Sequence, residues 1–127
     1  MLNIEPTKST PKVLYLENEK TLEISGESYP ENSFTFFEPL FQWLETALPQ
    51  LTYLTLKVNI RYMNSSSTKC LLDVLDLLVD AQARGTRVSV LWYYEAGNDR
   101  ALDLAEEFRE DLTLSFEIIP LPVGETP

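Results

Sequence analysis

Four consecutive hydroxyl residues, Ser65 to Thr68, lie within the segment RYMNSSSTKCLLDVLDLLVDAQARG, between a strand-like run and a strongly apolar helix. A serine or threonine directly before a helix caps one of its unpaired backbone N–H groups, and neighbouring serines are compatible with a turn. An exposed hydroxyl at this position can also accept a phosphate, which the helix dipole and the free N–H groups would favour. The two roles can coexist, although spacing alone favours the cap.

Residue types that commonly perform catalysis or bind metals are scarce in the rest of the chain. The sequence has no histidine, which removes the commonest general base, most zinc sites and the usual Ser–His nucleophile. Its four glycines form neither a P-loop nor a dinucleotide-binding pattern. Asp73, Asp76 and Asp80 share a helix face that could hold a divalent cation, but a solvated face is favoured because such sites usually recruit loop ligands as well. We therefore expect no enzyme, no metal and no cofactor.

Composition indicates one globular domain over residues 1–127, with 44% apolar and 24% charged residues. The net charge of −10 argues against a nucleic-acid partner and favours basic protein partners. No span is long and apolar enough for a membrane helix, and MLNIEPTKSTPK resembles neither a signal nor a transit peptide. We expect a cytoplasmic location and no membrane partner. Cys70, set among leucine and valine residues, is predicted to be a core residue.

Hydrophobic periodicity predicts alternating strands and helices. The strands are expected at 13–17, 20–25, 51–63, 86–94 and 114–119. The first helix is expected within 33–48, where Pro39 predicts either a kink or a start near Glu38. The second runs from about Ser67 to Ala83 and ends at Gly85, and the third is capped by Asn98. Residues 1–11 and 121–127 contain prolines and are expected to be loose.

This order predicts an α/β fold, a single domain with a mixed, mostly parallel sheet of about five strands. Polar residues alternate along 51–63, so we expect helices mainly on one face and the other face at least partly open. The loops after the parallel strands, 26–32, 63–69 and 92–98, should meet at one edge of the sheet. Exposed aromatic residues at this edge would suit a protein contact, although Trp92 could instead be core.

Three segments also carry a family resemblance: SGESYPENSFTFFEPLFQWLE, YMNSSSTKCLLDVLDLL and LAEEFREDL. Together, and above all through GESYPEN and NSSS, they resemble the SiaC family of bacterial regulatory phosphoproteins from about residue 4 to about residue 120. The implied architecture is similar to that of the STAS-like anti-sigma-factor antagonists, which carry a phosphorylatable hydroxyl at a helix N-terminus. The resemblance therefore implies a partner-switching protein.

The resemblance implies three protein partners: a serine/threonine kinase, a metal-dependent serine/threonine phosphatase and a diguanylate cyclase. The unphosphorylated form would bind and activate the cyclase, promoting cyclic di-GMP synthesis and biofilm formation. Matched through Y-x-N-x-S-S, the family's phosphorylated threonine falls on Ser65, a serine here, with Ser66, Ser67 and Thr68 as alternative acceptors. The residues expected to contact the partner come from the three edge loops: Glu27, Ser28, Tyr29, Pro30, Glu31, Asn32, Asn64, Ser66, Trp92 and Tyr94.

A different class of function is compatible with the same edge. A STAS-like domain could sense a nucleotide or another small anion through the N–H groups that begin the second helix. A thermal shift with a nucleotide panel separates the two hypotheses, because only the sensor gains stability from a small ligand.

Overall fold

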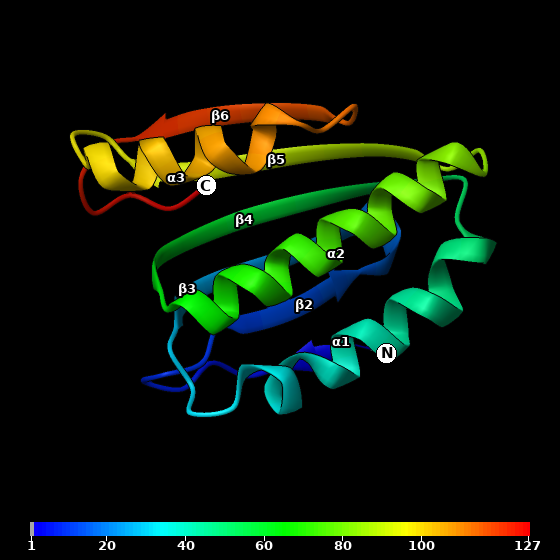
Figure 1. Cartoon of the computed structure of the whole chain (residues 1–127), viewed down its shortest axis with the longest axis horizontal. Coiled ribbons are helices and arrows are strands. Elements are labelled where there is room, and N and C mark those ends of the chain that lie inside the picture. The colour runs from blue at the N-terminus through cyan, green and yellow to red at the C-terminus, as the bar shows by residue number, and fades with distance from the viewer. Residues whose placement is uncertain (1) are drawn as a thin grey trace.

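The sheet contains six strands, which lie side by side in the order in which they occur along the chain (Figure 1). The structure is a computed structural model that describes residues 2–127. The strands are β1 (Asn3–Ile4), β2 (Lys12–Leu16), β3 (Thr21–Ser28), β4 (Tyr53–Met63), β5 (Arg87–Glu95) and β6 (Ser115–Leu121). The first three pair antiparallel and β3 to β6 pair parallel. The predicted α/β fold with a mostly parallel sheet is confirmed, with one strand more than expected.

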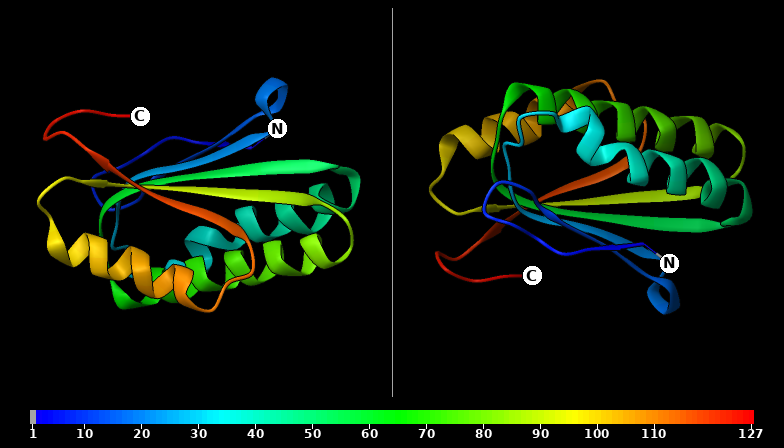
Figure 2. Two further views of the ribbon diagram at one scale, coloured as in Figure 1. Left: turned by 90° about the horizontal axis from the view of Figure 1, so that it is seen from above. Right: turned by 90° about the horizontal axis from the view of Figure 1, so that it is seen from below.

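Three helices connect the parallel strands: α1 (Ser33–Ala47), α2 (Ser65–Ala83) and α3 (Asp99–Glu110). All three cover the same face of the sheet, as predicted, and within residues 2–127 no α-helix covers the other face (Figure 2). This arrangement follows because right-handed crossovers between strands added in one direction place every connecting helix on the same side. In the described part of the chain, no helix combines the length and apolarity needed to cross a bilayer.

The hydrophobic core lies between this helical layer and the sheet. Val58 of β4, Val90 of β5 and Leu78 of α2 are fully buried. Tyr15 of β2 packs against Trp43 of α1 with 4.5 Å between the ring centroids. Cys70 is also fully buried, and burial raises the pKa of its thiol, which favours the protonated, unreactive form. The prediction of a core cysteine is therefore confirmed.

Apolar residues recur at spacings of three and four in both helices, which predicts buried stripes that include Phe34 of α1 and Leu72 of α2, but the observed stripes are slightly rotated. Phe34 was expected to be buried but is 48% exposed, because Ser33 takes the buried position in the first turn of α1. Leu72 is likewise 45% exposed, while Val74 is buried. Because successive helical residues point about 100° apart, a stripe placed one residue out leaves a large apolar side chain at the surface.

Helix α1 begins at Ser33 and continues through Pro39, so the alternative start near Glu38 is wrong. The cap explains the earlier start: the side chain of Asn32 accepts the N–H of Thr35 at 3.0 Å. At the end of α2, Gly85 has a φ of +110° and follows the last helical turn. The N–H of Thr86 then bonds to the carbonyl of Ala81 at 3.0 Å, a Schellman closure that confirms the glycine stop.

The N-terminal segment is more ordered than its prolines suggested. Asn3 and Ile4 pair with β2, and the N–H of Tyr15 donates to the carbonyl of Leu2 at 3.0 Å. Leu2 is buried, so the expectation of a loose segment is wrong for residues 2–4, while Met1 lies outside the described residues. At the other end, residues 122–127 are exposed, and Thr126 lines a small cavity on the open face.

Candidate functional site

The loops after β3, β4 and β5 bring the N-termini of all three helices to the carboxyl edge of the parallel strands. Asparagine caps each helix: Asn32 for α1, Asn64 for α2 and Asn98 for α3. Each side-chain oxygen accepts the backbone N–H three residues further on, at 2.9 to 3.1 Å. The edge therefore carries the positive end of three helix dipoles.

A cluster of serine hydroxyls joins the end of β3 to the beginnings of α1 and α2. The Ser67 oxygen lies 2.7 Å from that of Ser28 and 3.1 Å from that of Ser33. Ser33 also shares a hydrogen bond with Ser66 at 2.8 Å. Ser28, Ser33 and Ser67 are each at most 1% exposed, and Ser66 is half-buried. These hydroxyls therefore hold three chain segments together.

Asn64 adds to this network besides capping α2. Its backbone N–H donates to the carbonyl of Ser28 at 2.9 Å, and its side-chain amide donates to the carbonyl of Pro30 at 3.3 Å. The Ser66 hydroxyl donates to the Asn64 side-chain oxygen at 3.2 Å. The Thr68 hydroxyl donates to the Asn64 carbonyl at 3.1 Å. The β3–α1 loop and the first turn of α2 thus form one hydrogen-bonded unit.

Ser65 differs from its three neighbours in the hydroxyl run. It is the first residue of α2, it is exposed, and its hydroxyl makes no hydrogen bond within residues 2–127. Asn64 accepts the N–H groups of Ser67 and Thr68, so those of Ser65 and Ser66 remain available for a new acceptor. A phosphate on Ser65 would therefore meet free donors, whereas one on Ser67 would have to enter the core.

A β-bulge shapes the surface next to Ser65. The register between β3 and β4 shifts between Gly26 and Glu27, so that Arg61 is an extra residue on β4. Gly26 has a φ of +112°, a backbone conformation in which a residue with a side chain would be strained. Tyr62 alternates with the apolar Val58 and Ile60, which predicts it on the same buried face, but the bulge breaks the alternation and Tyr62 is 55% exposed.

The bulge brings two side-chain pairs to this surface. Tyr62 meets Tyr29 edge to face, with 5.9 Å between the ring centroids. Arg61 forms an exposed ion pair with Glu27 at 3.5 Å. The site thus presents paired aromatic rings next to a charged pair, which is a composition suited to protein recognition.

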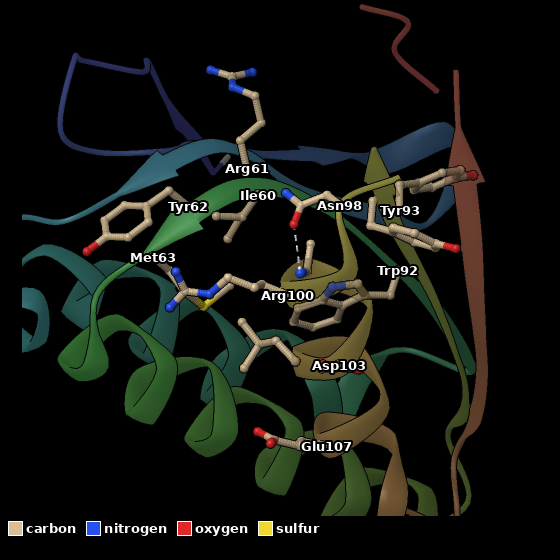
Figure 3. Close-up of a pocket in the computed structure, with 13 residues that line it drawn as sticks. Ile60, Arg61, Tyr62, Met63, Trp92, Tyr93, Asn98, Arg100, Asp103 and Glu107 are labelled. Carbon is tan, nitrogen blue, oxygen red and sulfur yellow. Dashed lines mark hydrogen bonds between the residues drawn. The ribbon is translucent and has the colours of Figure 1, made fainter. Parts of the chain in front are cut away.

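A cavity of about 490 Å³ opens between the end of β4, the end of β5 and the first turns of α3 (Figure 3). Its walls include Tyr62, Met63, Tyr94 and Leu104, and Arg100 extends across it. The chain reaches Ser65 two residues after Met63, so the cavity adjoins the start of α2. Sequence reasoning did not select Tyr62, Met63 or Arg100 as contact residues, although Tyr62 and Met63 begin the segment YMNSSSTKCLLDVLDLL, because only the fold brings the three together.

Trp92 was expected to contact the partner, but it is buried in the core. Its side chain is 3% exposed and packs between Phe108 of α3 and Phe116 of β6, with ring centroids 4.6 and 5.7 Å away. We therefore correct its assignment: Trp92 forms the floor of the cavity as a core residue and is not a free anchor. Tyr94 is half-buried and lines the same cavity.

The carboxylates of α2 lie along a partly solvated face of the helix. Asp76 and Asp80 are exposed, and within residues 2–127 no group of three His, Cys, Asp or Glu side chains is arranged to hold a metal ion. A solvated helix face accounts for these aspartates.

Comparison with known proteins identifies the family. A family model described as SiaC family regulatory phosphoprotein matches residues 4–121. The chain belongs to the SiaC family. This match confirms the resemblance seen in the sequence, and a family of regulatory phosphoproteins agrees with the expectation of a regulator rather than an enzyme.

Proteins from Pseudomonas aeruginosa are similar over nearly the whole chain. An uncharacterized protein of strain UCBPP-PA14 is 41% identical over 118 residues, which are 92% of this chain and 94% of that protein. A chain from the crystal structure of the diguanylate cyclase SiaD in complex with its activator SiaC has a TM-score of 0.90 and 39% identity, covering 95% of this chain and 100% of that one. A structure of SiaC has a TM-score of 0.87 and 39% identity, covering 94% and 98%.

Asn64 should contribute more to the stability of the fold than a residue that only caps a helix. We expect Asn64→Ala to lower the free energy of unfolding by about 1.5–2 kcal/mol, because the variant loses both the cap and the bond to the Pro30 carbonyl. Asn98→Ala, which removes only the cap of α3, should cost about 1 kcal/mol. Urea denaturation of both variants measures the difference, and equal losses would show that the Asn64 network adds nothing.

Proposed function

We propose that this chain is a cytoplasmic partner-switching protein that binds and activates a diguanylate cyclase when Ser65 is unphosphorylated. Phosphorylation of Ser65 by a serine/threonine kinase would end this interaction, and a metal-dependent phosphatase would restore it. The support for the partner is the match to a structure whose SiaC chain is the activator of the cyclase SiaD. The support for the switch is the family description as a regulatory phosphoprotein.

The single observation that favours Ser65 is its separation from the other hydroxyls. Ser66, Ser67 and Thr68 already make hydrogen bonds within the protein, while the Ser65 side chain is exposed and makes none within residues 2–127. A kinase must place the acceptor hydroxyl in its own active site. Within the hydroxyl run, only Ser65 offers this without breaking a hydrogen bond of the described residues.

The proposed mechanism is electrostatic and local. A phosphate adds a charge of about −1.5 to −2 at neutral pH. On Ser65 it would be stabilised by the start of α2, so it would not unfold the protein. A bound partner, however, would have to remove water from this charge or match it with arginine. A cyclase surface built for a neutral serine would therefore be released.

The contact surface that we propose combines the β3–α1 loop with the rim of the cavity. It includes the pair formed by half-buried Tyr29 and exposed Tyr62, with Tyr94 and Arg100 on the cavity wall. The polar rim would be formed by Glu27, Glu31, Asn32, Asn64 and Ser66, with apolar Pro30 among them, and buried Ser28 would hold the loop in position. Aromatic and arginine side chains around a concave site are typical of interface anchors.

The test of the switch is phosphopeptide mass spectrometry on the protein purified from its native cells, before and after phosphatase treatment. Each form is then mixed with the diguanylate cyclase that co-purifies with it, and cyclic di-GMP production is measured. We expect phosphate on Ser65 and cyclase activation by the dephosphorylated form only. Activation that is independent of phosphate, or a hydroxyl run that stays unmodified under all growth conditions, would contradict the proposal.

Filling the cavity tests the contact surface separately. Ala101 lies in the first turn of α3 and lines the cavity, so Ala101→Trp should block the entry of a partner side chain. We expect the affinity for the cyclase to fall at least about fivefold, the equivalent of roughly 1 kcal/mol. Ala83→Trp, at the exposed end of α2, is the matched control and should bind normally. Equal binding by both variants would exclude the cavity from the interface.

A further inference from the structure

Lys69 lies one helical turn after Ser65 and is the only charged residue within the first eight residues of α2. Positions i and i+4 of a helix share a face, and helical side chains lean toward the N-terminus, so the Lys69 side chain leans toward Ser65. Its ammonium lies 5.7 Å from the centroid of the Phe34 ring, in the first turn of α1. Lys69 therefore bridges the two helices next to the hydroxyl run.

The contact between Lys69 and Phe34 is exposed and exchangeable. Phe34 is 48% exposed, and cation–π contacts at exposed positions are weak. Asp73 is the one carboxylate a turn further along α2, yet no ion pair between Lys69 and Asp73 forms within residues 2–127. That order, with the lysine before the acid, is also the less favourable one on a helix. The ammonium thus remains available to a stronger anion.

We propose that Lys69 forms an intramolecular ion pair with the phosphate on Ser65, and that phosphorylation moves the Lys69 ammonium from the Phe34 ring to the phosphate. The inference rests on the proposed function, since it describes how the same switch works. An acid four residues before a lysine is the favourable order, and a phosphate carries more charge than a carboxylate. The free N–H groups of Ser65 and Ser66 would hold the phosphate at the helix end while Lys69 closes over it.

The consequence is a change at two places in the surface. Phosphorylation would uncover the Phe34 ring and would neutralise the one cation within the first eight residues of α2 while adding negative charge. In the unmodified protein Lys69 is free to pair with a carboxylate of the partner. Modification would remove that pair and also introduce repulsion, so one event would both weaken an attraction and add a repulsion at the interface.

The direct test uses the full chain with phosphoserine installed at position 65. In ³¹P NMR titrations, the nearby ammonium favours the dianion and should lower the second pKa of the phosphate. Lys69→Gln should raise that pKa by about 0.2–0.4 unit, the equivalent of an exposed i,i+4 ion pair. Arg84→Gln removes the same charge at the far end of α2 and should leave the pKa unchanged. An unchanged pKa in Lys69→Gln would overturn the inference.

A second readout follows the lysine itself. Protons above an aromatic face resonate upfield, so the ε-methylene of Lys69 should lose its upfield shift when Ser65 is phosphorylated. Phe34→Leu should remove that shift already in the unmodified protein. An upfield shift that persists in the phosphorylated chain would mean that Lys69 stays on Phe34, which contradicts the exchange.

Binding to the cyclase separates this inference from the proposed function. If phosphoserine at position 65 leaves the affinity unchanged, the proposed switch fails, whatever Lys69 does. If it weakens binding, Lys69→Gln should reduce the ratio between the two forms by about 1.5- to 5-fold, because the cation is already absent from the unmodified variant. A ratio equal to that of Arg84→Gln would overturn the role of Lys69 and leave the switch standing.

Discussion

Ser65→Asp is expected to weaken binding to the diguanylate cyclase by more than ~1.4 kcal/mol, which is tenfold, whereas Ser65→Ala should bind as tightly as the natural chain. The aspartate places a charge among the residues proposed to contact the partner, and the interface would have to remove its water. Alanine leaves the surface neutral. Because a carboxylate has less charge and fewer oxygens than a phosphate, phosphoserine itself should weaken binding further.

Calorimetric titration of the purified cyclase with each variant measures this difference. Ser115→Asp is a suitable control, because Ser115 is exposed at the start of β6 and lies at the opposite edge of the sheet. That variant adds the same charge and should bind normally. Equal affinities for Ser65→Asp and Ser65→Ala would exclude Ser65 as the switch and would direct attention to Ser66 or Thr68.

Ser67→Asp is expected to lower the free energy of unfolding by about 3–5 kcal/mol, although it differs from Ser65→Asp only by its place in the hydroxyl run. Ser67 is fully buried, and its hydroxyl bonds to Ser28 and Ser33. A carboxylate there would be desolvated and would separate the segments that the serine cluster joins. Ser65→Asp should instead be neutral or slightly stabilising, because an acid in the first turn interacts favourably with the helix dipole.

Thermal unfolding of the two variants provides the comparison. We expect Ser67→Asp to lower the melting temperature by roughly 10–20 °C, with little change for Ser65→Asp. Ser67→Ala removes the hydroxyl without adding charge, so its loss should be about 1 kcal/mol. Similar melting temperatures for both aspartate variants would contradict the burial of Ser67 and, with it, the reason for choosing Ser65.

The roles within the hydroxyl run show the limit of reading a motif alone. Spacing predicted that one hydroxyl caps α2, but the cap is Asn64, and a serine makes an equally good cap in principle. Ser33 was not considered, yet it lies at the centre of the cluster. Its contacts join residues more than thirty positions apart in the chain, and no local pattern reports such a distance.

The aromatic residues near the site also differ in whether the structure agrees with the prediction from sequence. Tyr29 and Tyr94 lie at the edge where the loop argument placed them, whereas Trp92 is buried and Tyr62 is exposed. Both differences arise from neighbours in space. The rings of Phe108 and Phe116 enclose Trp92, and the bulge opposite Gly26 and Glu27 interrupts the alternation before Tyr62.

The sequence by itself determined the order of strands and helices, the parallel sheet with helices on one face, and the family. These properties follow from hydrophobic periodicity, capping residues and local motifs, which act over a few residues and are therefore legible in the chain. Only the tertiary structure decided which hydroxyl is free, which aromatic is exposed and that Lys69 lies over Phe34. Each of these depends on contacts between distant segments, and burial and hydrogen bonding, not residue type, separate an available side chain from a structural one.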